Sequence, residues 1–204
     1  MYIPLNTPIE EIDYNFLKSA LSQYPKFRDK ITRLIKNKEI LRIKKGLYVL
    51  GEQHSQVPFY KETLANLIYG PSCISLEYAL SYYGLIPEKV LNITSVTPNR
   101  NKKFVTPVGL FTYRYLSPTA YQHGITQLDL DWQHSVIIAT VEKAIADTLK
   151  LVAPTITNTT ELESYLVEDL RIDLVEIKKL NIRALRYLER HYDSKTLTTF
   201  LKLL

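Results

Sequence analysis

Residues 41–50 read LRIKKGLYVL, and this stretch decides how the N-terminal part of the chain is interpreted. Apolar residues flank a basic pair, Lys44 and Lys45, which is followed by Gly46. Apolar runs on both sides of a short loop with glycine are typical of a β-hairpin, and glycine suits the positive φ of such a turn. The stretch therefore predicts two short strands joined by a basic turn.

A basic helix is predicted immediately before this hairpin. Pro25 can open it, because the N–H that proline lacks is not needed in a first turn, and the helix would run to about Asn37. At 100° per residue the apolar side chains share one face, namely Phe27, Ile31, Leu34 and Ile35. The opposite face and its flanks carry Asp29, Thr32, Arg33, Lys36, Lys26, Arg28 and Lys30.

A further helix is expected over residues 9–21, where Ile12, Phe16, Leu17 and Leu21 recur at helical spacing. Helix, basic helix and basic hairpin in this order predict a winged helix-turn-helix domain over residues 1–52. Such a helix can enter the major groove of DNA, and hairpin lysines can reach phosphates. The expected DNA-binding residues are Lys26, Arg28, Lys30, Thr32, Arg33, Lys36, Arg42, Lys44 and Lys45. A solvated charged helix followed by a charged turn is the simpler alternative.

The distribution of charge favours the first of these interpretations. Residues 24–46 contain nine basic and two acidic side chains, a net charge of +7, whereas the whole chain carries +5. The rest of the chain is therefore slightly acidic. A local basic patch is what a polyanion such as double-stranded DNA would contact.

Composition and length indicate a folded protein of one or two domains. The 204 residues are 46 % hydrophobic and 23 % charged, which is ordinary for a chain with a packed core. The single cysteine, Cys73, cannot form an internal disulfide, which fits a reducing compartment. The N-terminus lacks a basic segment followed by an apolar run, and no apolar stretch approaches the roughly 18 residues that span a bilayer. We therefore expect a cytoplasmic protein without a membrane partner.

A second, α+β domain is predicted over residues 58–204, after the polar linker GEQHSQVP at 51–58. It begins with helices over 59–69 and 74–83, and Gly84 is expected to end the second of them. Strands are predicted at 90–96, 103–106, 110–116 and 135–140. A helix over 141–151 with Thr140 as its N-cap follows, and then a helical C-terminal tail over 160–168, 174–179, 182–191 and 194–203. The sequence thus predicts a mixed domain with a small sheet.

No catalytic constellation emerges, and we expect neither an enzyme nor a cofactor. The four histidines stand at unrelated positions without metal-ligand spacing, and six glycines form no phosphate-binding loop. Asp129, Asp131 and the pair Glu142-Lys143 leave open a Mg²⁺-dependent nuclease. Glu142 and Lys143 are adjacent rather than alternating on a strand, so an acidic residue near a helix N-terminus is the favoured interpretation.

Three segments together resemble the AbiEi-type antitoxin and transcriptional-regulator family. They are RIKKGLYVL at 42–50, CISLEYALSYYGLIPE at 73–88 and ATVEKAIAD at 139–147. The resemblance spans most of residues 20–150. Each motif is short and rich in small or apolar residues, so it is their order and spacing that are specific.

The resemblance implies a bacterial antitoxin of a type IV toxin–antitoxin system, which acts in abortive infection and phage defence. Its N-terminal domain would bind operator repeats and repress its own operon. Its C-terminal domain would counter a nucleotidyltransferase-like toxin, by direct contact or only functionally. The alternatives are a stand-alone transcriptional regulator and a protein-interaction module whose basic patch meets an acidic partner.

Overall fold

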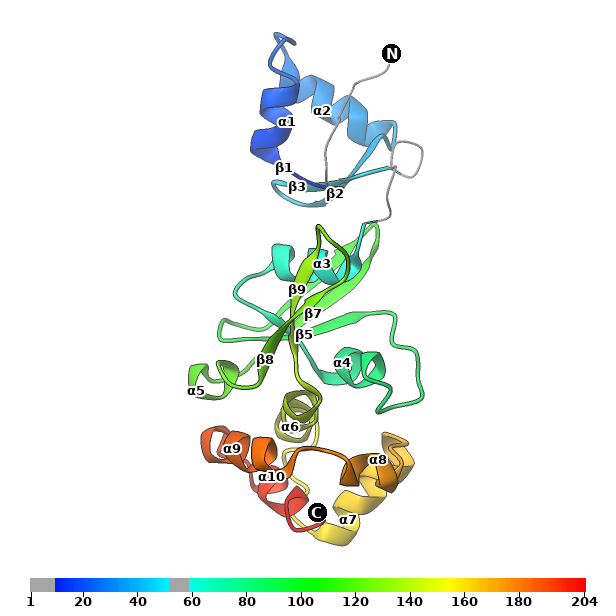
Figure 1. The fold of residues 1–204 in the computed structure, drawn as a ribbon. Helices are drawn as coiled ribbons and strands as arrows, with labels where there is room; N and C mark the ends of the chain where they lie inside the picture. The colour runs from blue at the N-terminus through cyan, green and yellow to red at the C-terminus, as the bar shows by residue number, and fades with distance from the viewer. Residues whose placement is uncertain (1–9, 52–58) are drawn as a thin grey trace.

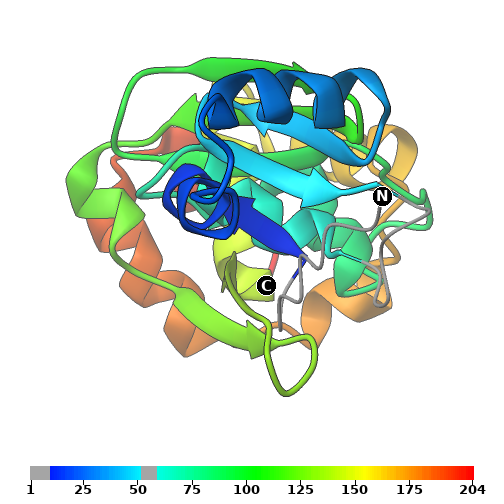
Figure 2. The same cartoon turned by 90° about the horizontal axis from the view of Figure 1, so that it is seen from above.

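Two helices and three short strands form an N-terminal unit in the computed structural model, which describes residues 10–51 and 59–204. The three strands make an antiparallel sheet in the order β1-β3-β2. Both helices cover the same face of this sheet and lie at one end of the molecule (Figures 1 and 2). In chain order the elements are β1 (Glu11–Asp13), α1 (Tyr14–Ala20), α2 (Phe27–Lys36), β2 (Ile40–Lys44) and β3 (Leu47–Leu50).

The predicted helix over 9–21 is wrong in its first part. Residues Glu11–Asp13 form β1, in which Ile12 pairs with Tyr48 of β3, and position 9 lies outside the described residues. The helix starts only after Asp13, whose carboxylate accepts a hydrogen bond from the N–H of Phe16 at 2.6 Å. Because this cap ends the extended segment, the apolar residue at position 12 belongs to a strand and not to the helical stripe.

The second helix and the hairpin are confirmed. The α2 helix buries Ile31 and Leu34 against the small sheet, as its periodicity predicts. Gly46 joins β2 to β3 with a φ of +88°. The turn therefore uses the left-handed conformation that glycine adopts without strain.

A six-stranded mixed sheet organises the second unit, in the order β6-β7-β5-β4-β9-β8. Its pairs β5–β7 and β4–β9 are parallel and the others are antiparallel. The chain is therefore of the α+β class. The elements up to the last strand are α3 (Lys61–Ile68), β4 (Cys73–Ile74), α4 (Leu76–Tyr82), β5 (Ile93–Thr97), β6 (Lys102–Thr106), β7 (Gly109–Tyr115), α5 (Pro118–Tyr121), β8 (Ile125–Asp129) and β9 (Ser135–Ala139).

The large sheet lies between two helical layers (Figure 1). On one side, α3 lies between the central strands and the small sheet, while β6 at the sheet edge contacts β2 directly; on the other side α4 and α6 cover the large sheet. The C-terminal helices pack beyond α6, which Thr140 caps as predicted, by accepting a hydrogen bond from the N–H of Lys143. These last elements are α6 (Val141–Leu151), α7 (Thr159–Ser164), the π-helix η1 (Tyr165–Asp169), α8 (Leu174–Lys178), α9 (Ile182–Tyr192) and α10 (Lys195–Phe200).

Strand β3 contributes to two apolar cores at once. Tyr48 and Leu50 join a small cluster with residues of α1 and α2, whereas Leu47 and Val49 join the large cluster of the second unit. All four side chains are buried. The predicted linker at 51–58 lies, except for Gly51, outside the described residues. Within residues 10–51 and 59–204, no helix combines the length and the apolar character that crossing a membrane requires.

Candidate nucleic-acid interface

The side of α2 that faces away from the small sheet is polar and basic. Arg28, Thr32, Arg33 and Lys36 are exposed there, and Lys30 is half-buried at its edge. Because Ile31 and Leu34 fix the helix on the sheet, these side chains project outward from a supported surface. This is the arrangement that a helix needs if its outer face is to enter a groove of DNA.

Local contacts orient several of these side chains. The ammonium of Lys30 lies 5.5 Å from the ring centroid of Tyr24, and the guanidinium of Arg28 lies 5.9 Å from that of Phe27. Cations at this distance from an aromatic ring are attracted to its face. Among the residues that the structure describes, neither Arg33 nor Lys36 forms an ion pair. Both cations therefore remain available to a ligand.

The structure places the two hairpin lysines differently. Nζ of Lys44 donates hydrogen bonds to the carbonyl oxygens of Leu67 and Ile68, at 2.8 and 2.7 Å. These carbonyls end helix α3, where a cation is favourable, and burial lowers the pKa of Lys44. Lys45 is exposed, as are Arg42 and Lys26. The expected phosphate-binding role of Lys44 thus competes with a contact inside the protein.

A second basic segment lies beside the hairpin, where sequence reasoning did not place one. Strand β6 runs next to β2, and its Lys102 and Lys103 are exposed, as is Arg100 just before it. The segment NRNKK at 99–103 is a visible basic run. The segment lies some 60 residues after the hairpin in the chain. The sequence does not indicate that the two meet, because the order of strands in a sheet cannot be read from local sequence.

The acidic residues of the nuclease hypothesis make separate contacts. Asp129 accepts a hydrogen bond from the side chain of Gln127, and Glu142 accepts one from the backbone N–H of Asn181 at 3.0 Å. Asp131 contacts His134 at 2.9 Å. In the described part of the chain, no three His, Cys, Asp or Glu side chains gather in the manner of a metal site.

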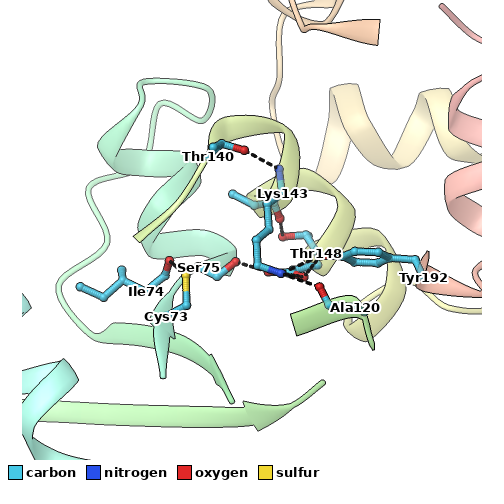
Figure 3. A network of polar contacts seen from close by, with 10 residues as sticks. Cys73, Ile74, Ser75, Ala120, Thr140, Lys143, Thr148 and Tyr192 are labelled. Carbon is cyan, nitrogen blue, oxygen red and sulfur yellow. Dashed lines mark hydrogen bonds and ion pairs between the residues drawn. The ribbon is translucent and has the colours of Figure 1, made fainter. Parts of the chain in front are cut away.

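A buried polar cluster lies inside the second unit, and Figure 3 shows its contacts from close by. It consists of Ser75, Lys143, Asp147 and Tyr192, all of them almost inaccessible to solvent. Nζ of Lys143 lies 3.3 Å from the Asp147 carboxylate and donates hydrogen bonds to the Tyr192 hydroxyl at 2.8 Å and to the Ala120 carbonyl at 3.3 Å. The hydroxyls of Ser75 and Tyr192 each donate to Asp147 at 2.5 Å.

This buried polar cluster holds separate parts of the fold together. Its members come from the β4–α4 junction, from α6 and from α9, so it joins three segments that are distant in sequence. Burial, together with the charge of Asp147 and the hydrogen bond to it, raises the pKa of Tyr192, and burial raises the pKa of the neighbouring Cys73 thiol. Neither group therefore ionises near neutral pH. Sequence reasoning missed the cluster because it considered Lys143 only beside Glu142, and local sequence does not show that Ser75, Asp147 and Tyr192 meet it.

No model of a known protein family matches the chain, and no curated protein matches its sequence.

The pairing of Asp131 with His134 predicts an acid-sensitive contribution to stability. Burial alone would raise the pKa of Asp131, but the backbone N–H groups of Gln133 and His134 and the His134 ring outweigh it and lower the pKa from 3.8 to about 2. The folded protein binds a proton on the Asp131 carboxylate less tightly than the unfolded chain does. The stabilisation is therefore complete above pH 3.8 and is lost as the pH falls toward about 2. We expect Asp131→Asn to remove this acid-dependent loss, as measured by urea unfolding over that pH range. Asp129→Asn, two residues earlier, is the matched control and should keep it.

Proposed function

We propose that the chain is a DNA-binding repressor whose residues 1–52 act as a winged helix-turn-helix domain. The observation that carries the proposal is the basic outer face of α2, supported by a sheet of order β1-β3-β2. In a winged helix the recognition helix precedes a hairpin whose second strand lies centrally in the sheet, and α2, β2 and β3 have this order. The element that would read DNA is therefore α2.

The geometry supports a division of roles within this interface. Thr32, Arg33 and Lys36 lie on the outermost part of α2 and would face base edges, where arginine can pair with guanine. The flanking cations would contact phosphates, which adds affinity that does not depend on sequence. These flanking residues are Lys26, Arg28, Lys30, Arg42 and Lys45, extended by Lys102 and Lys103 of β6.

Binding to its own upstream region tests the proposal directly. A mobility-shift assay compares DNA from upstream of the gene with a shuffled duplex of the same length, over a series of salt concentrations. We expect tighter binding to the upstream DNA and a steep fall in affinity with salt, since each phosphate contact releases counterions. Equal, weak binding to both duplexes would refute a sequence-reading role for α2.

The two hairpin lysines give a sharper test because Lys44 donates hydrogen bonds within the protein, whereas Lys45 is exposed. Lys45→Ala should leave the free energy of unfolding unchanged, weaken binding to every duplex and shallow the salt slope by about 0.9. Lys44→Ala should lower the free energy of unfolding by about 1–2 kcal/mol, because carbonyl groups at the end of α3 lose their donor. Urea unfolding and mobility shift on both variants measure this. The reverse pattern would contradict the assignment of the two side chains.

We further propose that the second unit acts as an antitoxin against a nucleotidyltransferase-like toxin. The support is the resemblance of the segments at 73–88 and 139–147 to the AbiEi-type family. Co-expression with the reading frame next to the gene tests it, since growth arrested by that frame should recover. Recovery should persist in Arg33→Ala, which alters only the DNA-reading face. Upstream DNA binding without recovery would instead describe a stand-alone regulator.

A further inference from the structure

A groove of about 700 Å³ lies at the seam between the N-terminal unit and the second unit. One wall comes from β1, α1 and β3, and the other from α3 and the β8–β9 turn. Its apolar lining includes Ile12, Phe16, Leu47 and Leu67, and Leu67 is 47 % exposed at the rim. We call this feature the seam groove. Its volume is in the range of sites that bind small organic molecules, roughly 300–1,000 Å³.

The polar side of the seam groove carries excess negative charge. Glu11 and His134 line it, and Nε2 of His134 lies 3.3 Å from the Glu11 carboxylate. Nδ1 of the same ring lies 2.9 Å from both oxygens of Asp131. Two carboxylates, those of Glu11 and Asp131, thus contact a single imidazole ring. No lysine or arginine stands among the described residues that line the groove.

The carboxylate of Glu11 is buried and has only a long contact with its side-chain partner His134. Its side chain is only 2 % exposed, and within the described residues neither oxygen receives a hydrogen bond of normal geometry. Burial raises the pKa of Glu11, and the contact with His134 and nearby backbone N–H groups offset this only in part. Most buried polar atoms in folded proteins are satisfied, and the ring of His134 is shared between Glu11 and Asp131. The Glu11 carboxylate can therefore accept a further donor from a ligand in the groove.

From these observations we infer that the seam groove binds a small organic cation, an ammonium group attached to an apolar body. The ammonium would donate to Glu11, and the body would lie against Phe16, Leu47 and Leu67. Such a ligand touches side chains of both units, so its binding would alter how firmly the N-terminal unit is held. The site does not depend on DNA binding and can be tested without DNA.

Three probes with one apolar body separate charge from hydrophobicity. They are 4-phenylbutylamine, 4-phenylbutanol and 4-phenylbutyrate, titrated into the full chain and followed by calorimetry. Trp132 provides a second signal, because it is the only tryptophan and lies on the β8–β9 turn beside Gln133 and His134, 89 % exposed. We expect the amine to bind about tenfold more tightly than the alcohol, since hydrogen bonds to ionised groups are the strong ones, and the acid not to bind.

Two variants locate the binding site. Glu11→Gln should bring the affinity for the amine to that for the alcohol, whereas the matched change Glu161→Gln on α7 should leave it unaltered. If Glu11→Gln does not fold, Leu67→Arg decides, because it adds a cation at an exposed rim position. That change should abolish binding of the amine, and Leu91→Arg, an exposed position away from the groove, should not. Equal binding of all three probes, no binding of the amine, or full binding by Leu67→Arg would overturn the inference.

Discussion

Replacing Asp147 with alanine should lower the free energy of unfolding by about 3–5 kcal/mol, the usual cost of leaving a buried charge without its partner. Within the described residues, the Lys143 ammonium would keep the Tyr192 hydroxyl and the Ala120 carbonyl as acceptors, and the Ser75 hydroxyl would lose its acceptor. All of these groups lie beyond the reach of bulk solvent, so bulk water cannot solvate the charge that remains. Urea unfolding of Asp147→Ala and of the parent protein measures the difference.

Two controls separate burial from charge as the cause. The double variant Lys143→Met with Asp147→Leu removes both charges, and we expect it to cost less than Asp147→Ala alone because no uncompensated ion remains. The exposed pair Glu176–Lys179 has the same kind of chemistry at the surface. Its variant Glu176→Ala should cost at most about 1 kcal/mol. A single variant that is no less stable than the double variant would show that the buried pair is not held as an ion pair.

Replacing Arg33 with alanine should weaken binding to the upstream DNA by about 10–100-fold, as the loss of a bidentate contact to a base does. The outward position of Arg33 on α2 and its freedom from ion pairs in the described residues make it the strongest candidate for such a contact. Because phosphate contacts would remain, binding to a shuffled duplex should fall much less. Mobility-shift titrations on both duplexes, at one salt concentration, measure how many fold the variant loses affinity for each duplex.

The matched control is Lys195→Ala, which removes the same charge from an exposed residue at the start of α10, at the opposite end of the molecule (Figure 1). It should leave binding to both duplexes unchanged. If Arg33→Ala weakened both duplexes equally, Arg33 would be a phosphate contact. If it weakened neither, α2 would not be the element that reads DNA.

Long elements with strong periodicity could be predicted from the sequence, and short ones could not. Helix α2, the β2–β3 hairpin and the capped helix α6 all follow from spacing and end signals. Strands β1 and β4 have three and two residues, too few to show any alternation. Strand β8 is an edge strand whose exposed polar residues hide its pattern. In these places, pairing with distant strands decides the structure, and local sequence does not record it.

Whether a lysine side chain is exposed, hydrogen-bonded or buried likewise cannot be predicted from the residues next to it in sequence. Lys44 and Lys45 are adjacent and chemically identical, yet one caps α3 and the other is exposed. Lys143 follows an acidic residue in a helix, a pattern typical of a surface, and is fully buried. The contact between Glu11 and His134 joins positions that are far apart in the chain. Each case depends on tertiary packing that only the folded structure supplies.

Strand β3 makes the two units share one element at their boundary. Its Leu47 and Val49 complete the core of the second unit, while Tyr48 and Leu50 complete that of the first. Cutting the chain after this strand would remove part of the apolar surface on which the second unit closes. The N-terminal unit is therefore not a detachable module on a tether. Transfer of the N-terminal unit to another protein would therefore need a matching apolar face on the recipient.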